Sequence, residues 1–181
     1  MKGIRFSDTD DFNSIHDNIN ILLLENYHII VDFIVARLRG SGYDITYKNS
    51  SIMGEPRLCK IAFPDAVISI NFLVNFTFHN LKRDVTLKFA VEIKSHIKSF
   101  GETLRQLQIY RECLENLNSR EWRRKTGQQF PFRNIFPVIL ISPDHRFDGA
   151  FISQGFHVLD PDILGISFKE KREKNLDDFQ R

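Results

Sequence analysis

The sequence predicts a single α/β domain in which helices flank a central mixed β-sheet. Apolar residues recur at helical spacing near the N-terminus, strand-length apolar runs fill the middle of the chain, and a second helical period follows them. With 181 residues, 42% of them apolar, the chain can bury one substantial core. We therefore predict one domain over residues 1–168 and a mostly charged tail over residues 169–181.

The first predicted element is a long helix near residues 12–39. N-cap candidates lie at residues 7–11, and Gly40 and Gly42 end the apolar period. The residues that set this period are Ile15, Ile19, Leu23, Tyr27, Ile30, Ile34 and Leu38.

Strand patterns follow the first helix. Residues 43–47 and 58–62 are short candidates, separated by a turn-rich stretch at residues 49–56. Residues 65–70 and 87–94 are stronger candidates, and the polar and aromatic stretch between them, residues 71–83, predicts a hairpin. Residues 137–142 form a continuous apolar run typical of a strand buried on both faces, and residues 156–159 are the candidate for a last strand.

A second helix is predicted near residues 100–118. Ser99 and Glu102 form a capping-box pattern, in which each side chain bonds a free backbone amide at the start of the helix. Gln106 and Tyr110 lie one turn apart, on the side expected to face inward. The apolar period behind the cap consists of Leu104, Leu107, Tyr110, Leu114 and Leu117.

An acid-x-lysine triplet, Glu92-Ile93-Lys94, ends the strand predicted at residues 87–94. Alternation along a strand sends Glu92 and Lys94 to the same face, where they could also form a solvated ion pair. Asp65 opens the strand predicted at residues 65–70, so pairing of the two strands would bring both carboxylates together. Carboxylate oxygens suit Mg²⁺ or Mn²⁺, and we predict Asp65 and Glu92 as metal ligands with the Ile93 carbonyl as an extra ligand. Lys94 is predicted to orient or help deprotonate the attacking water, or, as a charged side chain, to stabilise hydroxide and phosphate.

Pro64-Asp65 followed by Glu92-Ile93-Lys94-Ser95 resembles the PD-(D/E)XK nuclease superfamily. The segment from Gln106 to Tyr110 is similar to the Q-x-x-x-Y motif of RecB-type exonuclease domains and their CRISPR-associated relatives. The order and spacing of residues 37–43 and the two acidic motifs are similar to those of archaeal Holliday-junction resolvases. The resemblance implies a restriction-endonuclease-like αβββαβ core. It implies catalytic roles for Asp65, Glu92, Lys94, Gln106 and Tyr110.

The resolvases carry a glutamate on their first helix that would fall near Val31 in this chain. Glu25 and Asp32 are seven positions apart and share a helix face, so either could complete the metal site. Solvated helix charge is the alternative role for each of them.

Basic residues around an aromatic side chain suit phosphate contacts and base stacking. The net charge is only +2, so a nucleic-acid partner would need a local basic patch. The sequence offers one around Trp122, with a solvated loop end as the equal alternative. Its predicted members around Trp122 are Arg120, Arg123, Arg124 and Lys125, while Lys82 and Arg83 add charge on or near the predicted hairpin.

Other residue types exclude several classes of site. Cys59 and Cys113 lie in apolar contexts without metal-ligand spacing, which predicts reduced core thiols. The six histidines, His96 beside the triplet included, show no zinc or triad pattern. No signal-peptide pattern or bilayer-length apolar run is apparent, so we expect a soluble cytoplasmic protein without membrane contact.

Together these patterns predict a metal-dependent DNA nuclease. Endonuclease and exonuclease action, on branched DNA or on DNA ends, both remain open, as does DNA against RNA. The resemblance to resolvases implies a homodimer. The alternative is a catalytically inactive nucleic-acid-binding or assembly module with the same fold.

Overall fold

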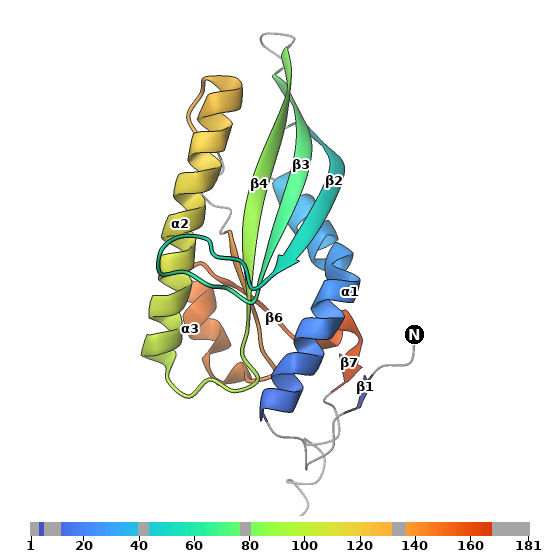
Figure 1. Cartoon of the computed structure of the whole chain (residues 1–181), viewed down its shortest axis with the longest axis vertical. Helices are drawn as coiled ribbons and strands as arrows, with labels where there is room; N and C mark the ends of the chain where they lie inside the picture. The colour runs from blue at the N-terminus through green and yellow to red at the C-terminus, as the bar shows by residue number, and fades with distance from the viewer. Residues whose placement is uncertain (1–3, 6–11, 40–43, 77–80, 132–136, 168–181) are drawn as a thin grey trace, which may run out of the picture.

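The computed structural model describes residues 4–5, 12–39, 44–76, 81–131 and 137–167 (Figure 1). A helix, three strands, a second helix and a further strand follow one another, before short elements complete the chain. The helices are α1 (Phe12–Arg39), α2 (Phe100–Thr126) and α3 (Asp148–Ser153), with short 3-10 turns η2 (His145–Phe147) and η3 (Pro161–Leu164). The strands are β1 (Ile4–Arg5), β2 (Ile45–Gly54), β3 (Ala66–Phe76), β4 (Leu81–Ile93), β5 (Val138–Ile141), β6 (His157–Leu159) and β7 (Ile166–Ser167).

The main sheet is mixed and has five strands in the order β2-β3-β4-β5-β6. Neighbours are antiparallel from β2 to β4 and parallel from β4 to β6. β1 and β7 form a separate parallel pair. The predicted α/β class and central mixed sheet are therefore confirmed, with β3 and β4 as neighbours.

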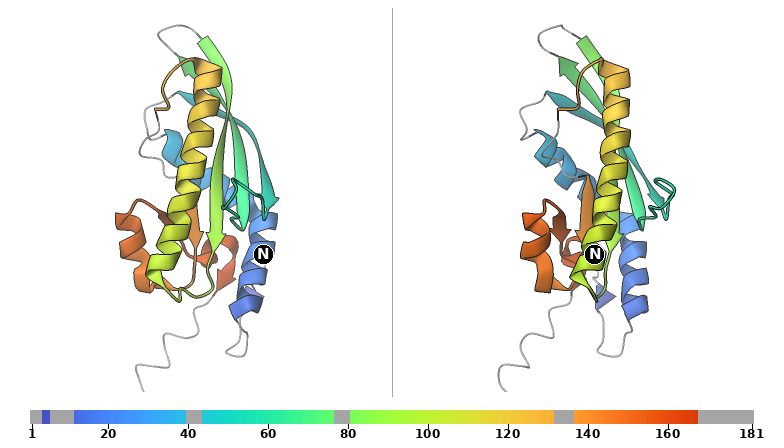
Figure 2. Two further views of the ribbon diagram at one scale, coloured as in Figure 1. Left: turned by 60° about the vertical axis from the view of Figure 1, so that its left-hand side comes forward. Right: turned by 90° about the vertical axis from the view of Figure 1, so that its left-hand side faces the viewer.

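Helices cover both faces of this sheet (Figures 1 and 2). On one face, α1 packs against inward-facing residues such as Ile68, Val91 and Ile139. On the other face, α2 and α3 pack against the alternate residues of the same strands, such as Val67 and Ala90. Because side chains alternate along a strand, β4 serves both cores, and β5 is buried along its whole length as its apolar run predicts.

The predicted first helix is confirmed, and its apolar period is the stripe that faces the sheet. Ile19, Leu23, Ile30 and Leu38 are fully buried. By length and composition alone α1 could cross a membrane, so the expectation that no run is long enough was wrong. The packing of its apolar stripe against the sheet accounts for that composition.

The segment between β2 and β3 differs from its prediction. Residues 49–54, predicted as a turn, continue β2 and pair with residues 66–71 of β3, because an edge strand can carry polar side chains on its solvent side. Residues 58–62, predicted as a strand, contain only an isolated bridge between Cys59 and Ala62. Cys59 and Cys113, predicted as reduced core thiols, instead form a disulfide. Their Cα atoms lie 6.4 Å apart, within the range that such a bond requires.

Helix α2 begins where the capping pattern predicts, with the Ser99 hydroxyl accepting a hydrogen bond from the Glu102 amide. It runs further than expected, to Thr126, and ends at Gly127, whose φ of 71° is left-handed. The basic residues predicted around a loop end therefore lie on its last turns. The hairpin of β3 and β4 and the strand β6 match their predictions, while residues 168–181 lie outside the described part of the chain.

Asn118 of α2 closes a gap in the hydrogen bonding of β4. The parallel neighbour β5 begins opposite Ala90, so β5 does not reach Lys88 on that edge. The Asn118 side chain accepts from the Lys88 amide at 2.8 Å and donates to the Lys88 carbonyl at 2.9 Å. A buried side-chain amide thus replaces one rung of the sheet.

We predict that Asn118→Ala lowers the free energy of unfolding by about 2 to 4 kcal/mol, since it leaves two backbone groups without partners. Urea denaturation followed by circular dichroism measures the change. The control is Asn116→Ala, an exposed asparagine on the same helix, for which the change should stay within about 0.5 kcal/mol. Equal effects at the two positions would contradict the bridging role.

Candidate active site

The register between β3 and β4 brings the two predicted acids together. Ala66 lies opposite Val91, so Asp65 and Glu92 follow as the next facing pair. One carboxylate oxygen of Asp65 accepts a hydrogen bond from the Ile93 amide at 2.6 Å. Ile93 therefore contacts Asp65 through its backbone N–H, and its side chain is buried in the α1 core.

Glu92 is an almost fully buried carboxylate, with 2% of its surface exposed. Its Oε1 accepts hydrogen bonds from Lys94 Nζ at 2.5 Å and from Gln106 Nε2 at 2.8 Å. Its Oε2 is buried and has no hydrogen-bond partner in the described part of the chain. Burial raises the pKa of Glu92, and the negative charge of Asp65 raises it further, while Lys94 acts in the opposite direction.

Gln106 and Tyr110 connect Glu92 to the loop that precedes β3. Gln106 Nε2 lies 2.6 Å from the Tyr110 hydroxyl, and that hydroxyl donates to the Phe63 carbonyl at 3.0 Å. Burial raises the pKa of Tyr110, and the nearby charge of Glu92 adds to the effect, so the phenol stays protonated. The five residues predicted as catalytic are therefore connected around the buried Glu92 and the half-buried Asp65.

The first-helix residue at this site is His16, which no pattern in the sequence indicates. His16 Nε2 lies 3.3 Å from the second oxygen of Asp65. Glu25 and Asp32, proposed to complete a metal site, are both exposed. Glu25 follows His16 by nine positions, which places it roughly 180° around the helix from it. Asp32 lies beyond the kink of α1 at Asn26. Only the docking of α1 reveals His16, since its local sequence carries no metal or catalytic motif.

A second Pro-Asp pair, which the sequence does not link to any triplet, positions the turn between β4 and α2. Asp144 accepts a hydrogen bond from the Ile97 amide at 2.9 Å, and Arg146 donates to the Ile97 carbonyl at 2.9 Å. Hydrogen bonds from Arg146 hold the pKa of Asp144 well below its usual range. The Ser142 hydroxyl donates to the Lys94 carbonyl at 2.7 Å. Ser142, Asp144 and Arg146 therefore fix the backbone at Lys94 and at Ile97, three residues later.

The predicted basic patch lies away from the acids. Along α2, the rise from Gln106 to Arg123 is about 25 Å. Trp122 is only 1% exposed and packs in the α1 core, so it cannot stack on a base as the prediction required. On the last turns of α2, Arg120, Arg123 and Arg124 are exposed and Lys125 is half-buried. Lys82 and Arg83, at the start of β4, are also exposed. Arg124 pairs with Glu121, so part of this charge is neutralised.

The site offers two carboxylates for a hard divalent cation, which commonly needs no more because water fills its remaining positions. Over the residues that the structure describes, no cluster of three or more His, Cys, Asp or Glu side chains forms a candidate metal site. No protein-family model, curated protein or solved structure matches the chain. The geometry of Asp65, Glu92 and their partners is therefore the available evidence for function.

Proposed function

We propose that the protein is a Mg²⁺- or Mn²⁺-dependent nuclease that hydrolyses DNA phosphodiester bonds at Asp65 and Glu92. The observation that carries the proposal is the buried Oε2 of Glu92, which has no partner among the described residues and stands beside a second carboxylate. An unpaired buried oxygen is unfavourable unless a cation or water satisfies it. The carboxylate pair therefore fits a divalent ion.

The order of elements supports the same proposal. The chain runs helix, three strands, helix, strand from α1 to β5, which is the αβββαβ order that the resemblance implies. Asp65 directly precedes the second strand of this series, Glu92 is the next-to-last residue of the third, and Lys94 directly follows it. The acids thus stand where a core of the proposed restriction-endonuclease-like type would carry them.

Each side chain has a definite task in the proposed reaction. A bound divalent ion would supply charge neutralisation and water activation. Lys94, half-buried beside Glu92, provides a positive charge for the phosphate oxygens. Gln106 holds Glu92 in place through Oε1, and His16 and the Ile93 amide orient Asp65.

A second candidate function is a nucleic-acid-binding or assembly module that keeps this fold without turnover. The observation that favours it is that the first-helix contact of Asp65 is His16, while Glu25 and Asp32 are exposed. Such a module would bind DNA without taking up Mg²⁺ or Mn²⁺. Isothermal titration with each ion separates the two functions, and sedimentation tests the homodimer that the resolvase resemblance implies.

A substrate panel tests the proposed activity directly. Linear duplex, single strand, closed circle, flap and four-way junction are each incubated with Mn²⁺ and with EDTA. Cleavage that requires Mn²⁺ supports the nuclease. The substrate that is cut distinguishes end processing from junction resolution, and no cleavage of any substrate favours the binding module.

We predict different effects for substitutions of the three central residues. Asp65→Asn and Glu92→Gln should nearly abolish cleavage and weaken Mn²⁺ binding, because each removes an anionic ligand while preserving shape. Lys94→Ala should retain more of the metal binding while losing about 10²- to 10⁴-fold in rate. Gel-based cleavage and Mn²⁺ titration measure the two quantities.

The control for these variants is Asp162→Asn, an exposed aspartate that also follows a proline. It should leave cleavage and Mn²⁺ binding unchanged. Undiminished cleavage by Glu92→Gln would refute the site, and so would a rate for Lys94→Ala within about threefold of the wild type.

We also predict that Glu92 lowers the stability of the metal-free protein as pH rises. Since the pKa of Glu92 is raised above its ordinary value of 4.5, the folded state holds this proton more tightly than the unfolded chain does. Its contribution to stability is therefore present below pH 4.5 and is lost as pH rises through the raised pKa. Glu92→Gln should become progressively more stable than the wild type over that window, and Mn²⁺ should stabilise only the wild type.

Thermal denaturation across this pH range in EDTA gives the measurement. Glu115→Gln, at an exposed position of α2, is the control and should follow the wild type. A Glu92→Gln variant that is less stable than the wild type at neutral pH would instead identify Glu92 and Lys94 as a structural ion pair.

A further inference from the structure

The loop between β2 and β3 presents two apolar side chains to solvent on a firmly held backbone. Ile61 is 70% exposed and Phe63 is 57% exposed. The loop is closed by a hydrogen bond from the Leu58 amide to the Ala62 carbonyl and is joined to α2 by the disulfide of Cys59. The Tyr110 hydroxyl also donates to the Phe63 carbonyl. These attachments hold the two apolar groups outward in a defined place.

Beside these side chains is a cavity of about 310 Å³ that shares a wall with the acid site. Gln106 and Tyr110 line the cavity, and Gln106 also bonds Glu92. The volume is at the small end of the range for small-molecule sites, so it suits one flat ring system rather than a longer ligand. The complete lining is Ile61, Phe63, Arg105, Gln106, Ile109 and Tyr110.

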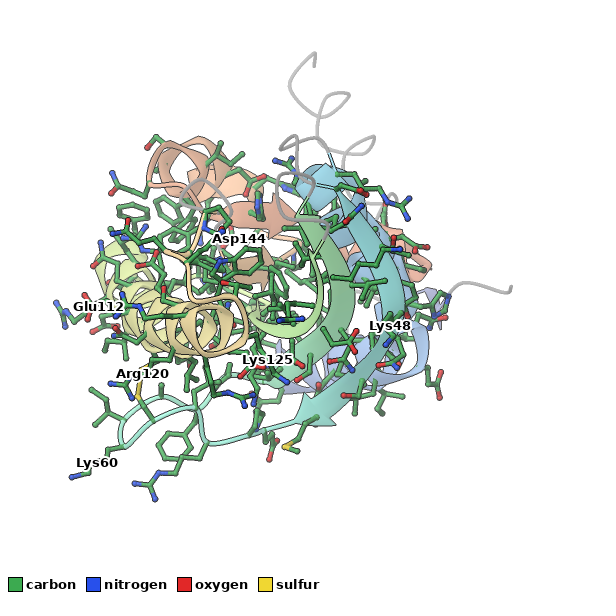
Figure 3. All side chains as sticks on the ribbon, turned by 90° about the horizontal axis from the view of Figure 1, so that it is seen from above. Lys48, Lys60, Glu112, Arg120, Lys125 and Asp144 are labelled. Atoms are coloured by element: carbon green, nitrogen blue, oxygen red, sulfur yellow. A yellow bond between two sulfur atoms is a disulfide. The ribbon has the colours of Figure 1, made fainter. Side chains whose placement is uncertain are left out.

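Three cationic side chains belong to this part of the surface. Arg105 lines the cavity, and it is exposed, as is Lys60 in the loop that carries Phe63. The Arg57 guanidinium lies over one face of the Phe63 ring, 5.8 Å from its centre. Figure 3 shows the Lys60 side chain extending away from the body of the protein. In the part of the chain that is described, none of these three cations forms an ion pair with a carboxylate. Exposed cations next to an apolar ring favour an anionic ligand with an aromatic group.

We propose that this cavity binds a nucleobase from an unpaired DNA strand, with Phe63 stacked on the base and Arg105 and Lys60 beside its phosphates. In a duplex, neighbouring bases cover both faces of each base, so only an unpaired base offers a face to Phe63. The shared wall formed by Gln106 places the phosphate next to this base near Glu92. The proposal rests on the nuclease function for its substrate, and it specifies single-stranded DNA, or DNA with an unpaired end, as that substrate.

The test measures binding in EDTA, so that it does not depend on cleavage. Labelled oligothymidylate and a blunt duplex are titrated against the full chain by fluorescence anisotropy. Phe63→Leu, which keeps an apolar side chain but removes the ring, should lower single-strand affinity about 5- to 100-fold. Phe63→Trp should retain the affinity. Ile152→Ala, at an equally exposed apolar position on α3, is the control and should bind as the wild type does.

Phe63→Trp also reports stacking directly. Its indole fluorescence should be quenched by oligothymidylate and much less by the blunt duplex, after subtraction of the wild-type signal from Trp122. Arg105→Gln should weaken binding and reduce the slope of log affinity against log salt by about 0.7.

Equal affinities of Phe63→Leu and the wild type, or equal quenching by single strand and duplex, would overturn the proposal. Unchanged Phe63→Leu binding in a protein that Asp65→Asn inactivates leaves the nuclease proposal standing and removes only this one. Quenching by single-stranded DNA in a protein that cleaves no substrate would support the base site and contradict the nuclease proposal.

Discussion

The antiparallel register of β3 and β4 sets the position of every residue in the candidate site. It places Asp65 opposite Glu92, and the Ile93 amide then lies within reach of the Asp65 carboxylate. A slip of one residue would send Glu92 into the α1 core and Ile93 toward α2, because side chains alternate along a strand. The apolar residues on both faces of these strands oppose such a slip, so core packing also maintains the geometry of the acids.

Helix α2 connects the site to its surroundings. Asn118 attaches the helix to the edge of β4, while Gln106 and Tyr110, about three and two turns earlier, contact Glu92 and the loop before β3. The Cys59 disulfide ties the same loop to Cys113 of this helix. One helix thus positions both the buried carboxylate of Glu92 and the loop that carries the exposed Phe63.

Burial of Glu92 disfavours the charged form of its carboxyl group more than any other contact at this site. Lys94 and Gln106 satisfy one oxygen, but burial and the charge of Asp65 still raise the pKa of the carboxyl group. Proteins commonly retain such an arrangement where charge is used in chemistry rather than in stability. The exposed Arg123 at the far end of α2 is separated from Gln106 by a helix rise of about 25 Å, so it does not contribute charge at the acids.

Local patterns in the sequence were sufficient to predict α1, the strands around the two acids, the Ser99 cap and the shared face of Glu92 and Lys94. Each depends on residues within a few positions of one another, where helical and strand periodicity act directly. Even there, polar residues 49–54 looked like a turn, because their pairing with β3 is not visible in their own sequence.

Tertiary structure alone decided the remaining features of the site. His16 reaches Asp65 because α1 docks with its first turns at the start of β3, and Cys59 meets Cys113 because the loop folds over α2. Trp122 is buried for the same kind of reason: the end of α2 lies against the sheet, and the sequence shows only its basic neighbours. These contacts join residues that are far apart in the chain. Local sequence determined which chemical groups each segment carries, and packing determined which of them meet.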